Sequence, residues 1–194
     1  MTEAHNTPEN TVVDIKANKE TIISLLKTTG RENIDCLITW LDTHAFFDAP
    51  ASKSNHNAFP GGLAKHSLDV YNEAIKLNAS YNLPTTSVTL CALLHDVCKA
   101  DQFYIDVNNN PRRNNQIIAR GHGIRSMFIV ARGCGVPLNY DEALAIWWHM
   151  GDYENSKEKY PAYYKESKQI PLCRLIHEAD DIAANCEKNK EMRK

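Results

Sequence analysis

The sequence predicts an all-α protein, a helical bundle that carries one small inserted β-hairpin. Apolar side chains recur at intervals of three and four residues along most of the chain, which is the spacing of one buried helix face. Glycine and proline separate these stretches at places where helices usually begin or end. One segment, residues 101–120, instead alternates apolar and polar side chains as a strand does. Together these observations favour helices packed on helices around one core.

Four helices are expected in the first half of the chain, at residues 18–29, 31–44, 62–79 and about 84–98. Gly30 ends the first of them, because glycine is the common residue just beyond a helix. In the second, apolar residues at positions 34, 37, 38 and 41 line one face. Residues 50–61 form an irregular loop, and Pro84 opens the fourth helix, since proline suits a first helical turn.

The hairpin and three further helices are expected in the second half of the chain, the helices at residues 123–132, 139–151 and 171–188. The hairpin runs through Phe103 and Ile105, turns at three asparagines, and returns in a second short run at residues 116–118. Asn139 and Glu142 have the spacing of a capping box. The segment 152–169 is polar and rich in tyrosine, so we expect a surface loop.

Length and composition indicate one domain, since 194 residues with 43% hydrophobic content can bury one substantial core. We expect residues 1–44 to be a helical segment packed on that domain, residues 45–188 to be its core, and residues 189–194 to be a disordered tail.

Charge and hydropathy exclude several classes of protein. A formal net charge of −2 argues against non-specific coating of nucleic acid, because such proteins are far more basic. No apolar run approaches the roughly 18 residues of a membrane span, and the polar start is unlike a secretory signal. The six cysteines form no C-x-x-C pair. We therefore expect reduced thiols, a cytoplasmic protein and no membrane partner.

Ionisable side chains lie on the apolar faces of three expected helices. His66 lies on the third, His95 and Asp96 lie at the end of the fourth, and Asp180 lies on the last. Burying such groups costs several kcal/mol unless they are paired or bound to a metal. Imidazole with carboxylate suits a divalent ion such as Mn, Fe, Ni or Zn, with Mg as a further candidate. Neighbouring residues can both ligate only where the helix ends or is distorted.

Two more histidines are expected at helix ends, where a side chain can turn toward a shared site. His122 opens the fifth helix within Gly121-His122-Gly123, and His149 closes the sixth. They would complete a second metal position, with Asp96 as the bridging carboxylate. Ordinary roles remain open for each residue taken singly: a histidine satisfied in the core, a turn or interface residue, or, for Asp180, an ion pair.

The ordered set resembles the HD-domain metal-dependent phosphohydrolases. The string LHDVCK at residues 94–99 matches their HD-x-x-K motif, and the Gly-His element at residues 121–122 matches the one that follows it. The segment from Ala49 to His66 is similar to one in HD-type 3′→5′ exoribonucleases and in small stand-alone bacterial and prophage HD hydrolases. His149 matches a histidine that dinuclear members, including HD-GYP phosphodiesterases, use for a second metal.

The resemblance covers residues 45–185, with two departures. Cys98 stands where the family often has glycine, and the chain has no room for the OB-fold that precedes the HD part of the exoribonucleases. The second departure argues against RNA as substrate.

The resemblance implies hydrolysis of a phosphomonoester or phosphodiester bond, in a nucleotide or short oligonucleotide, by a metal-activated water. One ion is expected, or two if His122 and His149 ligate. Asp96 would bridge or orient the water, and Lys99 would neutralise phosphate charge. The expected substrate contacts are Arg120, Arg125 and His56, with a surface role for each arginine and a loop hydrogen bond for His56 as the open alternatives.

Two other functions remain open. A metal-containing but non-catalytic HD module would bind a nucleotide or a partner protein, and a purely structural helical protein would bind no metal. Turnover on phosphate esters distinguishes the first from an enzyme. The sequence predicts no oligomeric state.

Overall fold

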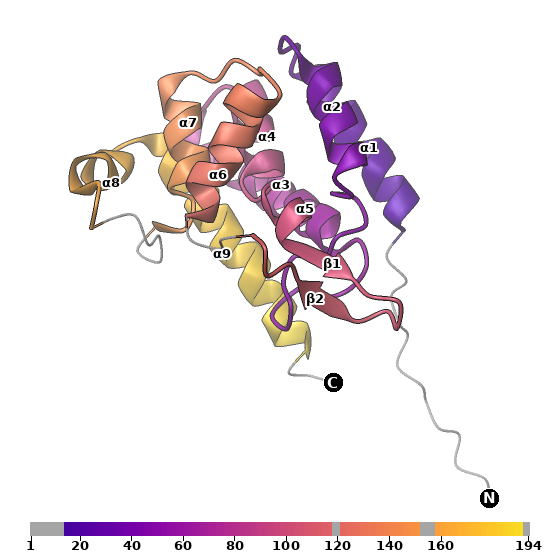
Figure 1. The fold of residues 1–194 in the computed structure, drawn as a ribbon. Coiled ribbons are helices and arrows are strands. Elements are labelled where there is room, and N and C mark those ends of the chain that lie inside the picture. Colours follow the sequence, from indigo (N-terminus) through magenta and orange to yellow (C-terminus); the bar gives the residue numbers. More distant parts are fainter. Residues whose placement is uncertain (1–13, 118–120, 152–157, 192–194) are drawn as a thin grey trace, which may run out of the picture.

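The computed structural model describes residues 14–117, 121–151 and 158–191, with side chains up to residue 185. It is an all-α bundle with one two-stranded antiparallel sheet, which confirms the predicted fold class (Figure 1). The helices are α1 (Ile15–Thr28), α2 (Ile34–Thr43), α3 (Gly62–Tyr81), α4 (Thr85–Leu94), α5 (Lys99–Gln102), α6 (His122–Phe128), α7 (Tyr140–Trp147), α8 (Pro161–Ser167) and α9 (Pro171–Glu191). A π-helical segment, Ile129–Gly133, continues α6.

Two groups of buried side chains form the core, and α3 and α4 contribute to both. Leu63 and Leu93 belong to the group that joins these helices to α1 and α2. Val70 and Cys91 belong to the group that joins them to α7 and α9. Every residue of α4 from Ser87 to Leu94 is buried, because this helix is surrounded by its neighbours. In Figure 1, α3 and α4 accordingly lie between α1 and α2 on one side and α6, α7 and α9 on the other.

The fourth helix ends at Leu94, four residues earlier than the sequence predicts. The chain then tightens: the N–H of Val97 donates to the carbonyl of Leu94 at 3.2 Å, and that of Lys99 to Asp96 at 2.9 Å. These i to i+3 bonds replace the regular helical pattern. His95 and Asp96 therefore lie in a turn between α4 and α5.

Helix α7, the sixth of the expected helices, also ends before its predicted limit, at Trp147 instead of residue 151. Its start is as predicted: the side chain of Asn139 accepts from the N–H of Glu142, and the Glu142 carboxylate accepts from that of Asn139, which completes the capping box. At the other end, the N–H of Gly151 donates to Trp148 at 2.9 Å, with Gly151 in the left-handed region (φ 53°). His149 thus belongs to the turn beyond the helix.

A buried ion pair connects this helix to the first half of the chain. The guanidinium of Arg31, in the turn between α1 and α2, pairs with the fully buried carboxylate of Glu142. The hydroxyl of Ser87 in α4 donates to the same carboxylate at 2.6 Å. Three elements are therefore joined by one buried acid.

The predicted hairpin is present but shorter than expected. Strands β1 (Phe103–Ile105) and β2 (Pro111–Arg113) pair antiparallel, with Tyr104 opposite Arg112. The carboxylate of Asp106 closes the turn by accepting N–H groups of two asparagines, each at 2.9 Å. The second run predicted at residues 116–118 is not a strand at 116 and 117, and residue 118 lies outside the described residues.

A helix lies where the sequence predicts a surface loop at residues 152–169, of which 152–157 lie outside the described part. This helix, α8, begins with Pro161 in its first turn, as proline favours. Its aromatic rings pack on the end of α7 and the residue that follows it: between ring centroids, Tyr163 lies 5.8 Å from Trp147 and Tyr164 lies 5.5 Å from Trp148. The polar composition of the segment gives no indication of this packing, so the sequence predicts a loop.

Two helix boundaries differ at the chain ends. Asp14 accepts from the N–H of Ala17 and starts α1 three residues earlier than predicted. The last helix, α9, continues to Glu191 and so covers residues 189–191 of the predicted disordered tail, while residues 192–194 lie outside the described part. No helix among the described residues is long and apolar enough to span a membrane.

Candidate metal centre

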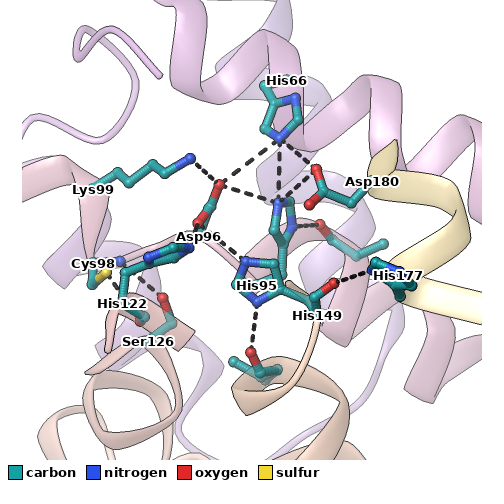
Figure 2. A network of polar contacts seen from close by, with 12 residues as sticks. His66, His95, Asp96, Cys98, Lys99, His122, Ser126, His149, His177 and Asp180 are labelled. Atoms are coloured by element: carbon teal, nitrogen blue, oxygen red, sulfur yellow. Dashed lines mark hydrogen bonds and ion pairs between the residues drawn. The ribbon is translucent and has the colours of Figure 1, made fainter. Parts of the chain in front are cut away.

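Four side chains predicted as ligands meet in the interior of the bundle (Figure 2). We call them the first group: His66, His95, Asp96 and Asp180. The Nε2 of His66 lies 3.1 Å from Oδ1 of Asp180 and 3.3 Å from Nε2 of His95. Oδ2 of Asp96 lies 3.4 Å from Nε2 of His95 and 3.8 Å from Nε2 of His66. Two nitrogen and two oxygen atoms thus face one another from α3, the turn after α4, and α9.

The other oxygen of Asp96 faces the two remaining predicted histidines. We call Asp96, His122 and His149 the second group. Oδ1 of Asp96 lies 3.7 Å from Nε2 of His122 and 3.4 Å from Nε2 of His149. Since Asp96 presents Oδ2 to the first group and Oδ1 to the second, it is shared by both.

Helix ends and close packing bring the second group into place. His122 is the first residue of α6 and follows Gly121, whose left-handed backbone (φ 71°) starts that helix. Gly123 packs directly on α7: a Cβ at this position would lie 2.1 Å from the carbonyl oxygen of Trp147. Only glycine permits that approach, so α6 and α7 place both histidines beside Asp96.

Main-chain carbonyls orient two of the imidazole rings. Nδ1 of His95 lies 2.8 Å from the carbonyl of Ala92, and Nδ1 of His149 lies 2.8 Å from that of Ile146. A carbonyl only accepts, so in each ring Nδ1 carries the hydrogen and donates it. In the neutral form of each ring, the lone pair of Nε2 then faces the centre, as a metal ligand requires.

A lysine balances the charge of the shared carboxylate. Nζ of Lys99 lies 2.5 Å from Oδ2 of Asp96. Burial raises the pKa of Asp96, but Lys99 and His95 lower it by more, so this pKa lies well below its usual range. Burial lowers the pKa of Lys99, and the Asp96 carboxylate more than reverses this, so the pKa of Lys99 is raised. Both side chains are charged at neutral pH.

Two histidines of this region stay neutral. Burial lowers the pKa of His122 to about 4, against the opposing effect of Asp96. Burial, followed by the charges of His66 and Lys99, lowers the pKa of His56 to about 4. At neutral pH each ring therefore has one unprotonated nitrogen that can accept a hydrogen bond or bind a metal.

The predicted substrate contacts are placed as follows. The ring of His56 lies 4.9 Å from that of His66, and neither of its nitrogens has a hydrogen-bond partner among the described residues. Arg125 lies one turn after His122 in α6, with one guanidinium nitrogen buried and likewise without a partner in the described part of the chain. Arg120 lies outside the described residues.

Three further residues, which the sequence analysis did not assign to the centre, form hydrogen bonds around it without touching its ligand side chains. The thiol of Cys98 donates to the carbonyl of His122 at 3.2 Å, and the hydroxyl of Ser126 accepts from the N–H of Cys98 at 3.3 Å. Burial raises the pKa of the Cys98 thiol to about 11, so it keeps its proton. Nδ1 of His177 lies 2.7 Å from the carbonyl of His149. The spacing of three residues between His177 and Asp180 on one helix was the available signal.

The donor set fits a divalent cation. Oδ1 of Asp96 and Nε2 of both His122 and His149 are buried, and none has a hydrogen-bond partner in the described ranges. Leaving such atoms unsatisfied is costly, and a cation would satisfy all three. The residues form three overlapping sets, and within each set the possible ligand atoms lie within 4.8 Å of one another. The sets are His66 with His95 and Asp96, His95 with His149 and Asp180, and Asp96 with His122 and His149.

Comparison with known proteins agrees with this geometry. The family model described as HD domain matches residues 63–185, which include both ligand groups. Neither the curated proteins nor the solved structures gave a match, so the similarity to HD-type exoribonucleases stays a prediction. HD-domain proteins are in general metal-dependent phosphohydrolases that bind divalent ions. The chain belongs to the HD-domain family.

Proposed function

We propose that this protein hydrolyses a phosphate ester of a nucleotide or short oligonucleotide with the help of divalent metal. One observation carries the proposal: two ligand groups share Asp96, whose oxygens face one group each. Such a shared carboxylate is suited to hold two cations side by side, as in dinuclear phosphoester hydrolases.

The chain would hold a first ion through His66, His95, Asp96 and Asp180, and a second through Asp96, His122 and His149. When bound, a divalent ion lowers the pKa of water toward neutrality and draws electron density from a phosphoryl oxygen. Asp96 would orient the water and the phosphoryl group, because each of its two oxygens faces a different ligand group. The bonds from His95 and His149 to main-chain carbonyls keep the imidazoles in one tautomer.

Three groups near the centre would bind phosphate. Lys99 carries a positive charge beside Asp96, with only 15% of its side chain exposed. The neutral ring of His56 and the guanidinium of Arg125 offer nitrogens that have no partner among the described residues. Low exposure strengthens their electrostatic effect on an anion. This supports a small phosphorylated substrate.

An aromatic group supports a nucleotide over other phosphate esters. Trp147 directly precedes the turn that carries His149, and it contacts the rings of Tyr160 and Tyr163 at centroid distances of 5.4 and 5.8 Å. Both tyrosines are exposed. Nucleobases stack on such rings with little regard to sequence.

Turnover on defined esters tests the proposal. Purified protein would be loaded separately with Mn, Fe, Ni, Zn, Co and Mg and assayed on a phosphomonoester, a phosphodiester, nucleotides and dinucleotides. We expect turnover with at least one ion, and its loss in Asp96→Ala. The matched control is Asp69→Ala, which removes a carboxylate from α3 that pairs with Lys65 on the same helix.

The outcomes separate the candidate functions. Turnover that survives in Asp96→Ala would contradict the assigned chemistry. Nucleotide binding without any turnover would favour a non-catalytic HD module. The number of ions bound by His122→Ala, compared with the number bound by wild type, tests whether His122 ligates a second ion. An unchanged number would exclude His122 as a ligand of a second ion.

A further inference from the structure

The second group is held from outside by two hydrogen bonds of the same kind. The thiol of Cys98 donates to the main-chain carbonyl of His122 at 3.2 Å. The Nδ1–H of His177 donates to the main-chain carbonyl of His149 at 2.7 Å. In Figure 2, Cys98 lies beside His122 at one margin of the cluster, and His177 lies beside the carbonyl of His149 at the other.

We propose that Cys98 and His177 are positioning residues that hold the two histidines of the second group at the distance a second ion requires. Neither side chain touches the centre itself. Each binds the backbone of a ligand residue, so each acts through that residue. The proposal deepens the proposed function and rests on it, since it concerns the second ion.

Backbone attachment matters here because both histidines lie at helix ends. His122 begins a helix of seven residues, and His149 follows the end of α7. The first and last turns of a helix lack part of the regular hydrogen bonding, so they move more readily than the helix interior. A hydrogen bond to the carbonyl of His122 and another to that of His149 restrain the backbone that sets the position of each imidazole.

The two bonds also attach the second group to the first. Cys98 follows Asp96 by two residues, and its N–H donates to Ser126 of α6, so the turn and α6 are joined twice. His177 lies one turn before Asp180 in α9, and its ring packs on Gly151, where a Cβ would lie 2.7 Å from Cε1 of the imidazole. Each positioning residue is therefore fixed to an element that supplies a ligand of the first group.

Metal titration tests the proposal without relying on activity. Metal-free protein would be titrated with Co²⁺, the bound ions counted by mass spectrometry, and each site followed by visible absorption. We expect wild type to bind two ions. Cys98→Ala and His177→Ala should keep the affinity of the first ion and bind the second about 10- to 100-fold more weakly.

Conservative variants separate positioning from general stability. Cys98→Ser keeps an O–H donor, and His177→Asn keeps an N–H at the place of Nδ1, so both should restore most of the affinity for the second ion. Circular dichroism would verify that each variant is folded. If an alanine variant does not fold, Cys98→Val or His177→Leu replaces it, because each fills volume without donating.

The chain offers matched controls for both changes. Cys91→Ala removes another buried thiol that lies 3.8 Å from a carbonyl, that of Glu142. His44→Ala removes another Nδ1 bond to a carbonyl, that of Trp40 at 2.9 Å. Neither lies in the ligand groups, so both variants should bind two ions as wild type does.

Each result has one meaning. Wild-type affinity for the second ion in both alanine variants would overturn the proposal, and loss in only one of them would restrict it to that residue. Equal weakening of both ions would also overturn it. A wild-type protein that binds a single ion would overturn it and leave the proposed function standing. Binding of no ion at all would instead overturn the proposed function.

Discussion

At the scale of single residues, Asp96 has the largest role in the centre. It is almost fully buried, at 1% exposure, yet its pKa lies well below the usual range because Lys99 and His95 compensate for burial. A charged carboxylate in the interior is costly unless such partners are present. Its two oxygens face different histidines, which no other carboxylate of the two groups does.

Replacing the two carboxylates separately should therefore have unequal effects. Asp96→Asn keeps the shape of the side chain but removes the charge shared by both groups. We therefore expect the affinity for both ions to fall by more than about 100-fold, which exceeds the loss caused by removing a hydrogen-bond partner of a ligand. Asp180→Asn should weaken the first ion much more than the second. Calorimetric titration with Mn²⁺ measures both affinities. Equal losses in the two variants would show that Asp96 is not shared.

At the scale of elements, the crossing of α6 and α7 decides where the second group lies. The helices approach so closely at Gly123 that a methyl group would lie 2.1 Å from the oxygen of Trp147. Real side chains do not come that close, so any larger residue must push the helices apart. His122 is the neighbour of Gly123, and it would move with α6.

Adding one methyl group should thus test the crossing. We expect Gly123→Ala to destabilise the fold by about 1–3 kcal/mol, as overpacking in a core does, and to weaken the second ion selectively. Gly133→Ala is the control, because a Cβ there meets its nearest neighbour at an ordinary 3.9 Å. Urea unfolding and metal titration of both variants provide the comparison. A Gly123→Ala protein as stable as Gly133→Ala would mean that the helices separate at no cost.

At the scale of the whole molecule, the centre joins parts that are far apart in sequence. The residues proposed as its ligands come from α3, the turn after α4, α6, the turn after α7, and α9. The unfolded chain cannot bring these together, so an ion binds mainly to the folded state. Binding of that kind stabilises the fold by mass action.

Metal should therefore raise the melting temperature. At an ion concentration 100 times the dissociation constant, stabilisation by one ion is about 2.7 kcal/mol. For a chain of this size that corresponds to roughly 5–10 °C, given about 2–4 °C per kcal/mol. Differential scanning fluorimetry with and without Mn²⁺, followed by a chelator, measures the shift and its reversal. His66→Ala should show much less of it, and an equal shift in that variant would place the ion elsewhere.

The sequence by itself determined the fold class, the family and the set of residues that meet in the centre. Helical periodicity carries the fold class, because packing on one face imposes it wherever the helix lies. These residues could be named because histidine and aspartate are unusual on apolar faces, and because their order along the chain is that of the family. The roles of His56 and Arg125 as substrate contacts stay predictions.

Only the tertiary structure decided how those residues face one another. Helix α4 ends at Leu94 and α7 at Trp147 because of turns that the apolar pattern does not mark. Packing on α7 likewise made α8 a helix despite its polar sequence. Cys98 and His177 act on carbonyls that are 24 and 28 residues away, and a main-chain carbonyl has no signature in the sequence. Contacts between distant segments depend on the packed fold, which local composition and spacing do not encode.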